Sequence, residues 1–162
     1  MGCYTGLRYS DLAKLNQSNI QGSVIKITTA KTGETVIIPI HTVVKRIVDH
    51  YGGFPPSISN QKTNENLKTI MEIAGFDSDV IVTEYRGGKN KRTDIVKKKY
   101  ELITTHTARR SFATNMYLSG DVPVHSIMKI TGHRTERSFL TYIVLENREH
   151  TDIVGMSKFF TE

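Results

Sequence analysis

The helical patterns in the last third of this chain contain charged and reactive side chains that do not suit an apolar core. Arg109 lies inside an amphipathic helical pattern, and His133 and Tyr142 follow it, nine residues apart. Arg8 and His106 lie upstream. Burying an unpaired arginine is expensive, so a fold that includes these groups needs something to offset their charge. We therefore expect the chain to gather these five side chains around an anion.

The composition is that of one globular domain. With 162 residues, 38% hydrophobic and 23% charged, the chain can bury a sizeable core. It has no run of about 18 apolar residues. Its N-terminus, MGCYTGLRYS, lacks the apolar segment of a secretory signal. Cys3 is its one cysteine, so no disulfide can form within the chain. These features predict a single domain over residues 1–162 in a cytoplasmic setting, without a membrane segment.

The charge of the chain points to a polyanionic partner. The formal net charge is +6, and the stretch RGGKNKRTDIVKKK at 86–99 holds seven basic residues against one acid. One interpretation is a solvated hairpin that its lysines keep soluble. The other is an edge that contacts DNA phosphates. In the second interpretation the DNA-binding side chains are Arg86, Lys89, Lys91, Arg92, Lys97, Lys98 and Lys99.

Periodicity predicts a mainly α fold with a small antiparallel β-sheet near the front of the chain. Short β runs are expected near 19–20, 24–29 and 35–40, with a tight turn at Gly33, and a hairpin is expected between 80–85 and 93–96. Helices are expected over 7–15, 41–51, 60–74, 107–119, from Pro123 to Gly132, from Thr135, and over 148–160.

The strings around the two histidines suit anion binding. His106 and Arg109 are three residues apart at a helix start, so they share a face at the end of the helix that favours an anion. An arginine there can bind two phosphate oxygens at once. Alternatively, Arg109 pairs with a core carboxylate and His106 caps the helix. His133 follows Gly132, which lets the backbone turn and the imidazole point into a cleft.

Tyr142 and Lys31 could supply nucleophile and acid. A tyrosine normally keeps its proton to about pH 10, and flanking arginines and an imidazole would stabilise its phenolate. A phosphotyrosyl intermediate would conserve the energy of a broken phosphodiester. Lys31 lies just before a hairpin turn, where it is either a solubilising charge or a general acid. Zinc is not expected, because the sequence has no His-x3-His pair and no cysteine cluster.

Four separated motifs resemble those of the catalytic domain of tyrosine recombinases, the phage and transposon integrase family. They are TGLRYSDL at 5–12, TTAKTGETVIIPI at 28–40, HTARRSFAT at 106–114 and TGHRTERSFLTY at 131–142. The resemblance runs from residue 2 to about residue 145. It implies the catalytic-core fold of these enzymes, DNA integration or recombination as the activity, and a bacterial or phage origin.

The resemblance also implies a role for each residue of the motifs. Arg8 and Arg109 would hold the non-bridging oxygens of the scissile phosphate, and His133 would bond a phosphate oxygen. Lys31 would protonate the 5′-hydroxyl leaving group, and His106 would assist proton transfer. Tyr142 would attack and become 3′-phosphotyrosyl. No metal or other cofactor is implied.

The partners implied by the family are double-stranded DNA and further copies of the chain. Family members act as homotetramers in a synaptic complex, whereas an isolated chain is expected to be a monomer. They also carry a helical DNA-binding domain before the first arginine motif, so we expect this chain to be the catalytic half of a longer protein. The apolar residues of the expected tail helix over 148–160 could dock on a neighbouring protomer or pack on their own domain.

Three positions depart from the usual family pattern. Thr131 stands where leucine is usual, Arg110 where a second histidine is frequent, and Asp11 where glutamate is commoner. Asp11, three residues after Arg8, is expected to orient that guanidinium. Two alternatives remain open at this point. A type IB topoisomerase shares the tyrosine chemistry, and a DNA-binding module could have lost catalysis, although such a module has no need of the phenol.

Overall fold

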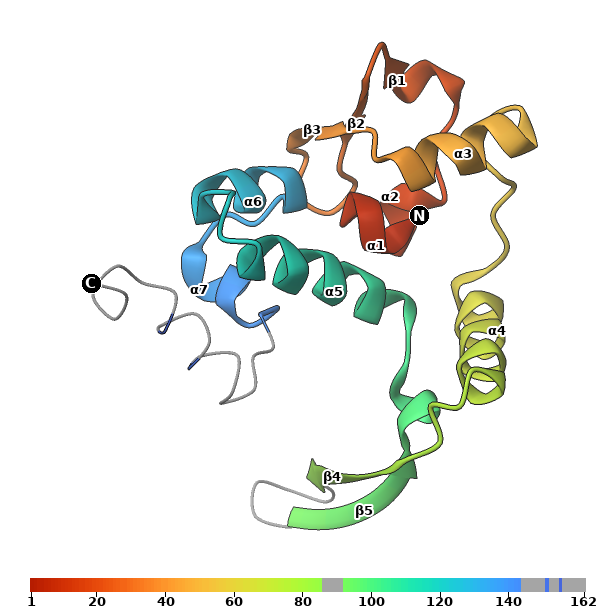
Figure 1. Cartoon of the computed structure of the whole chain (residues 1–162), viewed down its shortest axis with the longest axis vertical. Coiled ribbons are helices and arrows are strands. Elements are labelled where there is room, and N and C mark those ends of the chain that lie inside the picture. Colours follow the sequence, from red (N-terminus) through yellow and green to blue (C-terminus); the bar gives the residue numbers. More distant parts are fainter. Residues whose placement is uncertain (86–91, 144–150, 152–154, 156–162) are drawn as a thin grey trace. The chain divides into compact units, whose positions relative to one another are not determined.

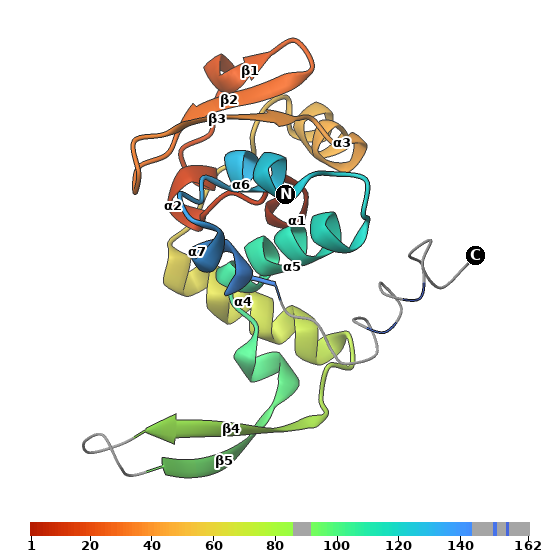
Figure 2. The same ribbon diagram turned by 90° about the vertical axis from the view of Figure 1, so that its left-hand side faces the viewer.

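The computed structural model describes residues 1–85, 92–143, 151 and 155. The chain forms two compact units (Figure 1, Figure 2). Unit 1 combines Met1–Ser57 with the chain from Ala108 onward, and unit 2 is Ile58–Thr107. Helices predominate, and the strands form two small antiparallel sheets, which confirms the predicted fold class. In the described part of the chain no helix is long and apolar enough to span a membrane.

Unit 1 begins with two short helices, of which the second lies within the helix expected over 7–15 and the first was not predicted. They are α1 (Gly2–Thr5) and α2 (Tyr9–Leu12). Gly6 ends α1 with φ 63°, a left-handed conformation that glycine adopts without steric cost. Arg8 then takes an extended conformation before α2. The helix expected over 7–15 is thus confirmed only for its middle part, Tyr9–Leu12.

A three-stranded sheet follows, in the order β1-β2-β3. Its strands are β1 (Ile20–Gln21), β2 (Val24–Thr28) and β3 (Thr35–Pro39), after the short turn η1 (Gln17–Asn19). Residues alternate between buried and exposed along β2 and β3, with Ile25 opposite Ile38 and Ile27 opposite Val36. The sheet therefore has one apolar face, as the alternation in the sequence predicts.

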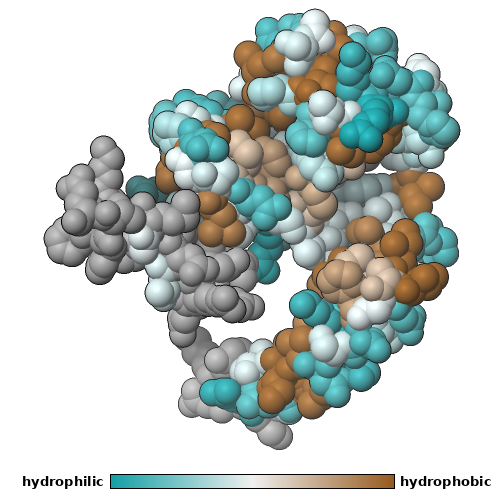
Figure 3. Space-filling view, in the orientation of Figure 1, coloured by the Kyte–Doolittle hydropathy of each residue, from teal (hydrophilic) through white to brown (hydrophobic). Residues whose placement is uncertain are grey.

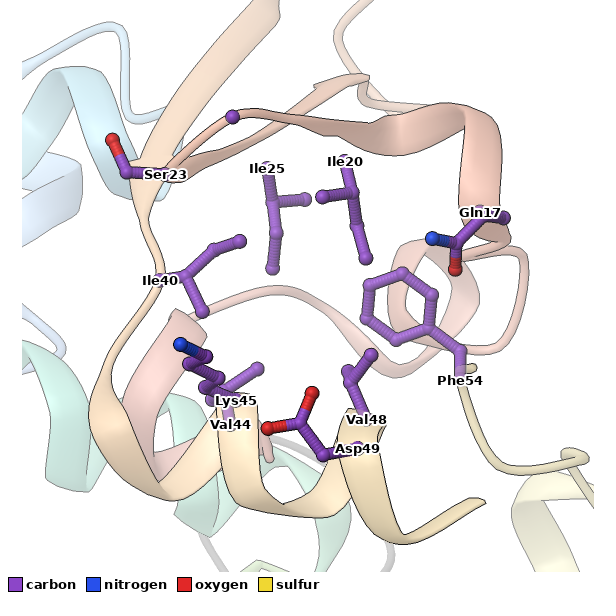
Figure 4. A pocket seen from close by; sticks show the side chains of 11 residues that line it. Gln17, Ile20, Ser23, Ile25, Ile40, Val44, Lys45, Val48, Asp49 and Phe54 are labelled. Atoms are coloured by element: carbon purple, nitrogen blue, oxygen red, sulfur yellow. The ribbon is translucent and has the colours of Figure 1, made fainter. Parts of the chain in front are cut away.

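Helix α3 (Thr42–Tyr51) packs against this apolar face through Val44, which is 1% exposed. A cavity of about 380 Å³ remains between the sheet and α3 (Figure 4). Its lining is mostly apolar, with Lys45 and Asp49 contributing charged side chains. This cavity includes none of the residues that the sequence singles out.

A second core cluster of unit 1 joins the last helices. They are α5 (Thr105–Leu118), whose first turn belongs to unit 2, α6 (Val124–Thr131) and α7 (Glu136–Leu140). Ala113, Ile127 and Phe139 are its buried members, and Tyr142 packs on it half-buried. Thr135 caps α7 as predicted, accepting a hydrogen bond from Ser138 N–H at 3.2 Å. The expected tail helix over 148–160 lies outside the described residues, apart from residues 151 and 155.

Unit 2 contains α4 (Asn60–Ile73), the hairpin of β4 (Asp79–Tyr85) and β5 (Arg92–Lys98), and the turn η2 (Lys99–Leu102). This hairpin and helix α4 confirm the prediction. Apolar side chains reach the surface of the unit (Figure 3), with Ile73 82% exposed and Ile81 72% exposed. Among the described side chains of unit 2, none is fully buried.

Candidate active site

Arg109 is the centre of the candidate site. It projects from α5, is only 2% exposed and donates one hydrogen bond through Nη1 to the Gly6 carbonyl at 2.6 Å. Its Nη2 donates to the Thr131 carbonyl and approaches His133 Nε2 at 3.3 Å. Two backbone carbonyls from segments far apart in sequence thus hold the guanidinium in place. The alternative in which Arg109 pairs with a core carboxylate is not what this structure contains.

Gly6 can lie this close to Arg109 because it has no side chain. A Cβ at this position would collide with the ring of Phe112, one turn after Arg109 on α5. The glycine lets the first motif approach α5 closely enough for its carbonyl to accept the Arg109 hydrogen bond.

Three buried polar atoms of this region have no hydrogen-bond partner among the described residues. They are Arg8 Nη1, Arg109 Nε and Asp11 Oδ2. Buried donors without an acceptor are rare, because each costs about 1–3 kcal/mol. The two guanidinium nitrogens are therefore free to donate to an anion.

The electrostatics of Arg109 are consistent with such an anion site. Burial is the main cause that lowers the pKa of Arg109, to about 10, and the positive charge of Arg8 adds to the effect. Tyr142, by its charge and a hydrogen bond, and Asp11 act in the opposite direction. Arg109 remains charged at neutral pH, but two cations share a buried region that a bound anion would stabilise.

His133 is held in one tautomer by its neighbour. The Thr131 hydroxyl donates its proton to the Ile127 carbonyl at 2.7 Å, so it can only accept from His133 Nδ1, also at 2.7 Å. Nε2 then carries the lone pair and accepts from Arg109 Nη2. His133 would need a second proton, on Nε2, to donate to a phosphate oxygen from that nitrogen.

Tyr142 lies beside both groups. Its ring centroid is 5.3 Å from Arg109 Cζ and 4.6 Å from the His133 ring, which meets it edge-on at 62°. The backbone of Tyr142 is fixed by its N–H bond to the Phe139 carbonyl, at 2.8 Å, and by Thr114, whose hydroxyl donates to its carbonyl at 3.3 Å. The structure therefore brings Arg8, Arg109, His133 and Tyr142 together.

Unlike the buried Arg109, Lys31 and His106 are both exposed. Lys31 is exposed in the turn between β2 and β3, and this turn is tied down on both sides. Asp11 Oδ1 accepts from Ala30 N–H at 2.8 Å, and Arg134 Nη2 donates to the Thr32 carbonyl at 2.8 Å. His106 is exposed in the first turn of α5, within unit 2.

Comparison with known proteins identifies the family. The model of the phage integrase family matches residues 2–149. The chain belongs to the phage integrase family. Integrase membership agrees with the four motifs and with the resemblance to tyrosine recombinases. A search of curated proteins finds no match to this integrase sequence.

Solved structures share the fold of this integrase chain. XerA recombinase matches with a TM-score of 0.69 at 17% identity, over 97% of this chain and 55% of XerA. XerH site-specific recombinase, bound to a palindromic difH substrate, matches with a TM-score of 0.66 at 12% identity, over 95% of this chain and 42% of the XerH chain. The Tn1549 transposon integrase, in complex with a circular intermediate DNA, matches with a TM-score of 0.60 at 14% identity, over 96% of this chain and 56% of the integrase chain. The predicted tyrosine recombinase catalytic-core fold is confirmed, and the chain spans about half the length of these proteins.

The integrase departs from our expectation at Asp11 and Thr131. Asp11 is 1% exposed, and it holds the turn that carries Lys31 rather than forming an ion pair with Arg8. Thr131 positions His133 from its own helix. Its hydroxyl role could have been suspected from the unusual residue type in the fourth motif. Arg110 is exposed.

The basic stretch of the integrase is mostly neutralised where it is described. Lys97 pairs with Glu84 at 2.8 Å, Lys98 with Asp79 at 2.8 Å, and Arg92 with Asp94 at 3.3 Å. Lys99 Nζ lies 5.8 Å from the centroid of the Phe76 ring. The remaining predicted DNA contacts, Arg86, Lys89 and Lys91, lie outside the described residues.

Within the described ranges, no three His, Cys, Asp or Glu side chains cluster as a metal site requires.

Proposed function

We propose that this chain is the catalytic part of a site-specific DNA recombinase that cleaves and rejoins strands through a 3′-phosphotyrosyl intermediate. One observation carries the proposal. Buried nitrogens of Arg8 and Arg109 lack an acceptor among the described residues, and Tyr142 lies against Arg109. A phosphodiester would supply the missing acceptors and put phosphorus beside a nucleophile.

Cleavage then proceeds by exchange of one ester for another. The Tyr142 oxygen forms a bond to phosphorus while the bond from phosphorus to the 5′ oxygen breaks. The phenol proton passes to a base, for which the family motif offers His106, and the 5′ oxygen takes a proton from Lys31. Attack by a 5′-hydroxyl on the phosphotyrosine reverses these steps and rejoins a strand, so no external energy source is needed.

The two arginines stabilise the charge that develops on the phosphoryl oxygens. Arg109 is held before the substrate arrives, since two backbone carbonyls anchor it, and Arg8 presents a buried Nη1 from the residue before α2. Preorganised donors of this kind are worth most in the transition state. His133 joins them once its Nε2 carries a proton.

The partner in this proposal is double-stranded DNA, as it is for the solved XerH and Tn1549 integrase complexes. Units 1 and 2 together would form one catalytic domain. Further copies of the chain would join it in a homotetrameric synaptic complex, because strand exchange between two duplexes needs four cleavages.

Trapping on a nicked duplex tests the proposal. Cleavage next to the nick releases a short strand that diffuses away, so the protein stays covalently attached and migrates more slowly on a denaturing gel. A pool of nicked duplexes with randomised sequence avoids the need to know the target. The chain should form the adduct, and Tyr142→Phe should bind DNA without forming one.

Tyr117→Phe is the matched control, because Tyr117 is a half-buried tyrosine on the same core cluster as Tyr142. It should retain the adduct. An adduct on Tyr142→Phe would refute the assignment of the nucleophile. DNA binding without any adduct by the parent chain would favour the inactive binding module.

A further inference from the structure

A polar cleft of about 300 Å³ opens directly beside His133 in unit 1. Its charged and titratable lining comes from the start of β3, from α6 and from the turn after α6. The residues are Glu34, His125, Lys129, His133 and Arg134. The cleft therefore shares His133 with the candidate active site, while its other side chains have no role in the chemistry proposed above.

Two of the polar side chains that line the cleft come from α6. His125 and Lys129 are four residues apart, one helical turn, and both are exposed, because Ile127 on the opposite face is completely buried. Among the described residues no carboxylate pairs with Lys129. Arg134 adds a guanidinium from the residue after His133, with 66% of its side chain exposed.

We infer that this cleft binds a second phosphate of the DNA strand, next to the one held by Arg8 and Arg109. The inference rests on the proposed function and extends its DNA contacts. A lysine and an arginine around a polar hollow suit a phosphate, which a lysine binds as a point charge and an arginine through two hydrogen bonds. Because the cleft adjoins His133, the phosphate that enters it belongs to the strand being cleaved.

Glu34 competes with that phosphate for Arg134. Its Oε1 accepts from Arg134 Nη2 at 3.2 Å, and the same nitrogen donates to the Thr32 carbonyl at 2.8 Å. A phosphate that takes the place of Glu34 leaves the bond to Thr32 intact. Arg134 therefore links the strand backbone to the turn that carries Lys31.

Salt-dependent binding of the chain to a random-sequence duplex tests this inference. Losing one phosphate contact lowers the slope of log affinity against log salt by about 0.9. Lys129→Gln and Arg134→Gln should each show this loss, and Lys129→Arg should retain the parent slope. Glu34→Gln should bind more tightly than the parent. Lys45→Gln is the matched control, because this exposed lysine lines the other cavity (Figure 4) and should keep the parent slope.

A neutral methylphosphonate in place of the phosphate next to the cleaved one tests which DNA phosphate the cleft binds. This replacement should weaken DNA binding by the parent. Lys129→Gln already lacks the contact, so its affinity should not fall further. Unchanged slopes for both Lys129→Gln and Arg134→Gln overturn the inference, as does an equal methylphosphonate effect on parent and Lys129→Gln. A parent that forms the covalent adduct while the slopes stay unchanged refutes the cleft alone. Reduced slopes without an adduct refute the proposed chemistry and leave the phosphate site standing.

Discussion

Units 1 and 2 handle charge in opposite ways. Unit 1 buries Arg109 and Asp11 at 2% and 1% exposure, and neither forms an ion pair with the other. Unit 2 buries no charged side chain among its described residues and pairs its charges on the surface, as in Lys97–Glu84 and Lys98–Asp79. The first arrangement costs stability, and the second contributes little to it.

This contrast separates the two kinds of basic residue in the chain. A high local density of lysines and arginines does not by itself leave positive charge available: in the described part of the stretch 86–99, Arg92, Lys97 and Lys98 are each paired with a carboxylate. An isolated arginine within an apolar pattern is more informative. The fold keeps Arg109 buried at a cost, and we infer that a bound phosphate offsets that cost.

The largest expected effect that tests this contrast between units 1 and 2 is a loss of cleavage rate. Arg109→Ala removes a preorganised donor and should reduce the cleavage rate by on the order of 10²–10³-fold. Duplex affinity should fall far less, because the lost stabilisation belongs to the transition state. Single-turnover cleavage of a nicked duplex, with affinity measured in parallel, checks this expectation.

Arg92→Ala is the corresponding change in unit 2. Arg92 is also an arginine, but it is exposed and paired with Asp94. Its loss should leave the cleavage rate unchanged. If Arg109→Ala lost affinity and rate equally, Arg109 would be a binding residue only.

A smaller effect is expected from Thr131→Val, which keeps the shape of a buried side chain but removes its hydroxyl. His133 Nδ1 loses this acceptor, and because the ring is only half-buried the loss of unfolding free energy should stay at or below about 1 kcal/mol, the lower end for a buried donor. The nitrogen-15 shifts of the His133 ring report the tautomer directly. They should show a proton on Nδ1 in the parent and a mixture in the variant.

Thr131→Ser retains the hydroxyl and is the control for this change. It should restore the parent tautomer. A variant Thr131→Val with the parent tautomer and full cleavage would mean that Arg109 alone orients His133.

The smallest effect concerns the surface pairs of unit 2. A double-mutant cycle on Lys97→Gln and Glu84→Gln should give a coupling of about 0.2–1 kcal/mol, because both side chains are partly exposed. Chemical denaturation of the four variants measures it. A coupling well above this range would make the hairpin pairs a major source of stability and weaken the contrast with unit 1.

Much of the architecture could be predicted from the sequence because it depends on local patterns. Alternation along 24–29 and 35–40 fixes which face of the sheet is buried, and the glycine at residue 33 marks its turn. The spacing of nine residues between His133 and Tyr142 spans one short helix, so the two rings meet. The small extent of α2 within 7–15 could not be predicted, since a short and a long helix have the same apolar spacing over these residues.

The acceptors of Arg109 could not be predicted, because they are backbone atoms brought together by tertiary packing. The Gly6 carbonyl is 103 residues away and the Thr131 carbonyl 22 residues away. Asp11 presents the same difficulty. Its proximity to Arg8 in sequence suggested that it orients that guanidinium, whereas its carboxylate accepts a hydrogen bond from Ala30 N–H, 19 residues distant. Residue types suggested the candidate side chains, and only the fold shows which residues hold them.

The tight contact at Gly6 bears on how this family can decay. If Tyr142 is the nucleophile, as we propose, selection for cleavage maintains it, and a lineage that stops recombining DNA can replace it freely. Gly6 is not released in the same way, because a Cβ there would collide with the Phe112 ring even in a protein that only needs to fold, and its φ of 63° disfavours most side chains as well. Gly132 also has positive φ, but a Cβ there would meet its nearest neighbour at 3.7 Å, so asparagine could replace it. In an inactive descendant the glycine of the first motif should therefore outlast the tyrosine of the last one.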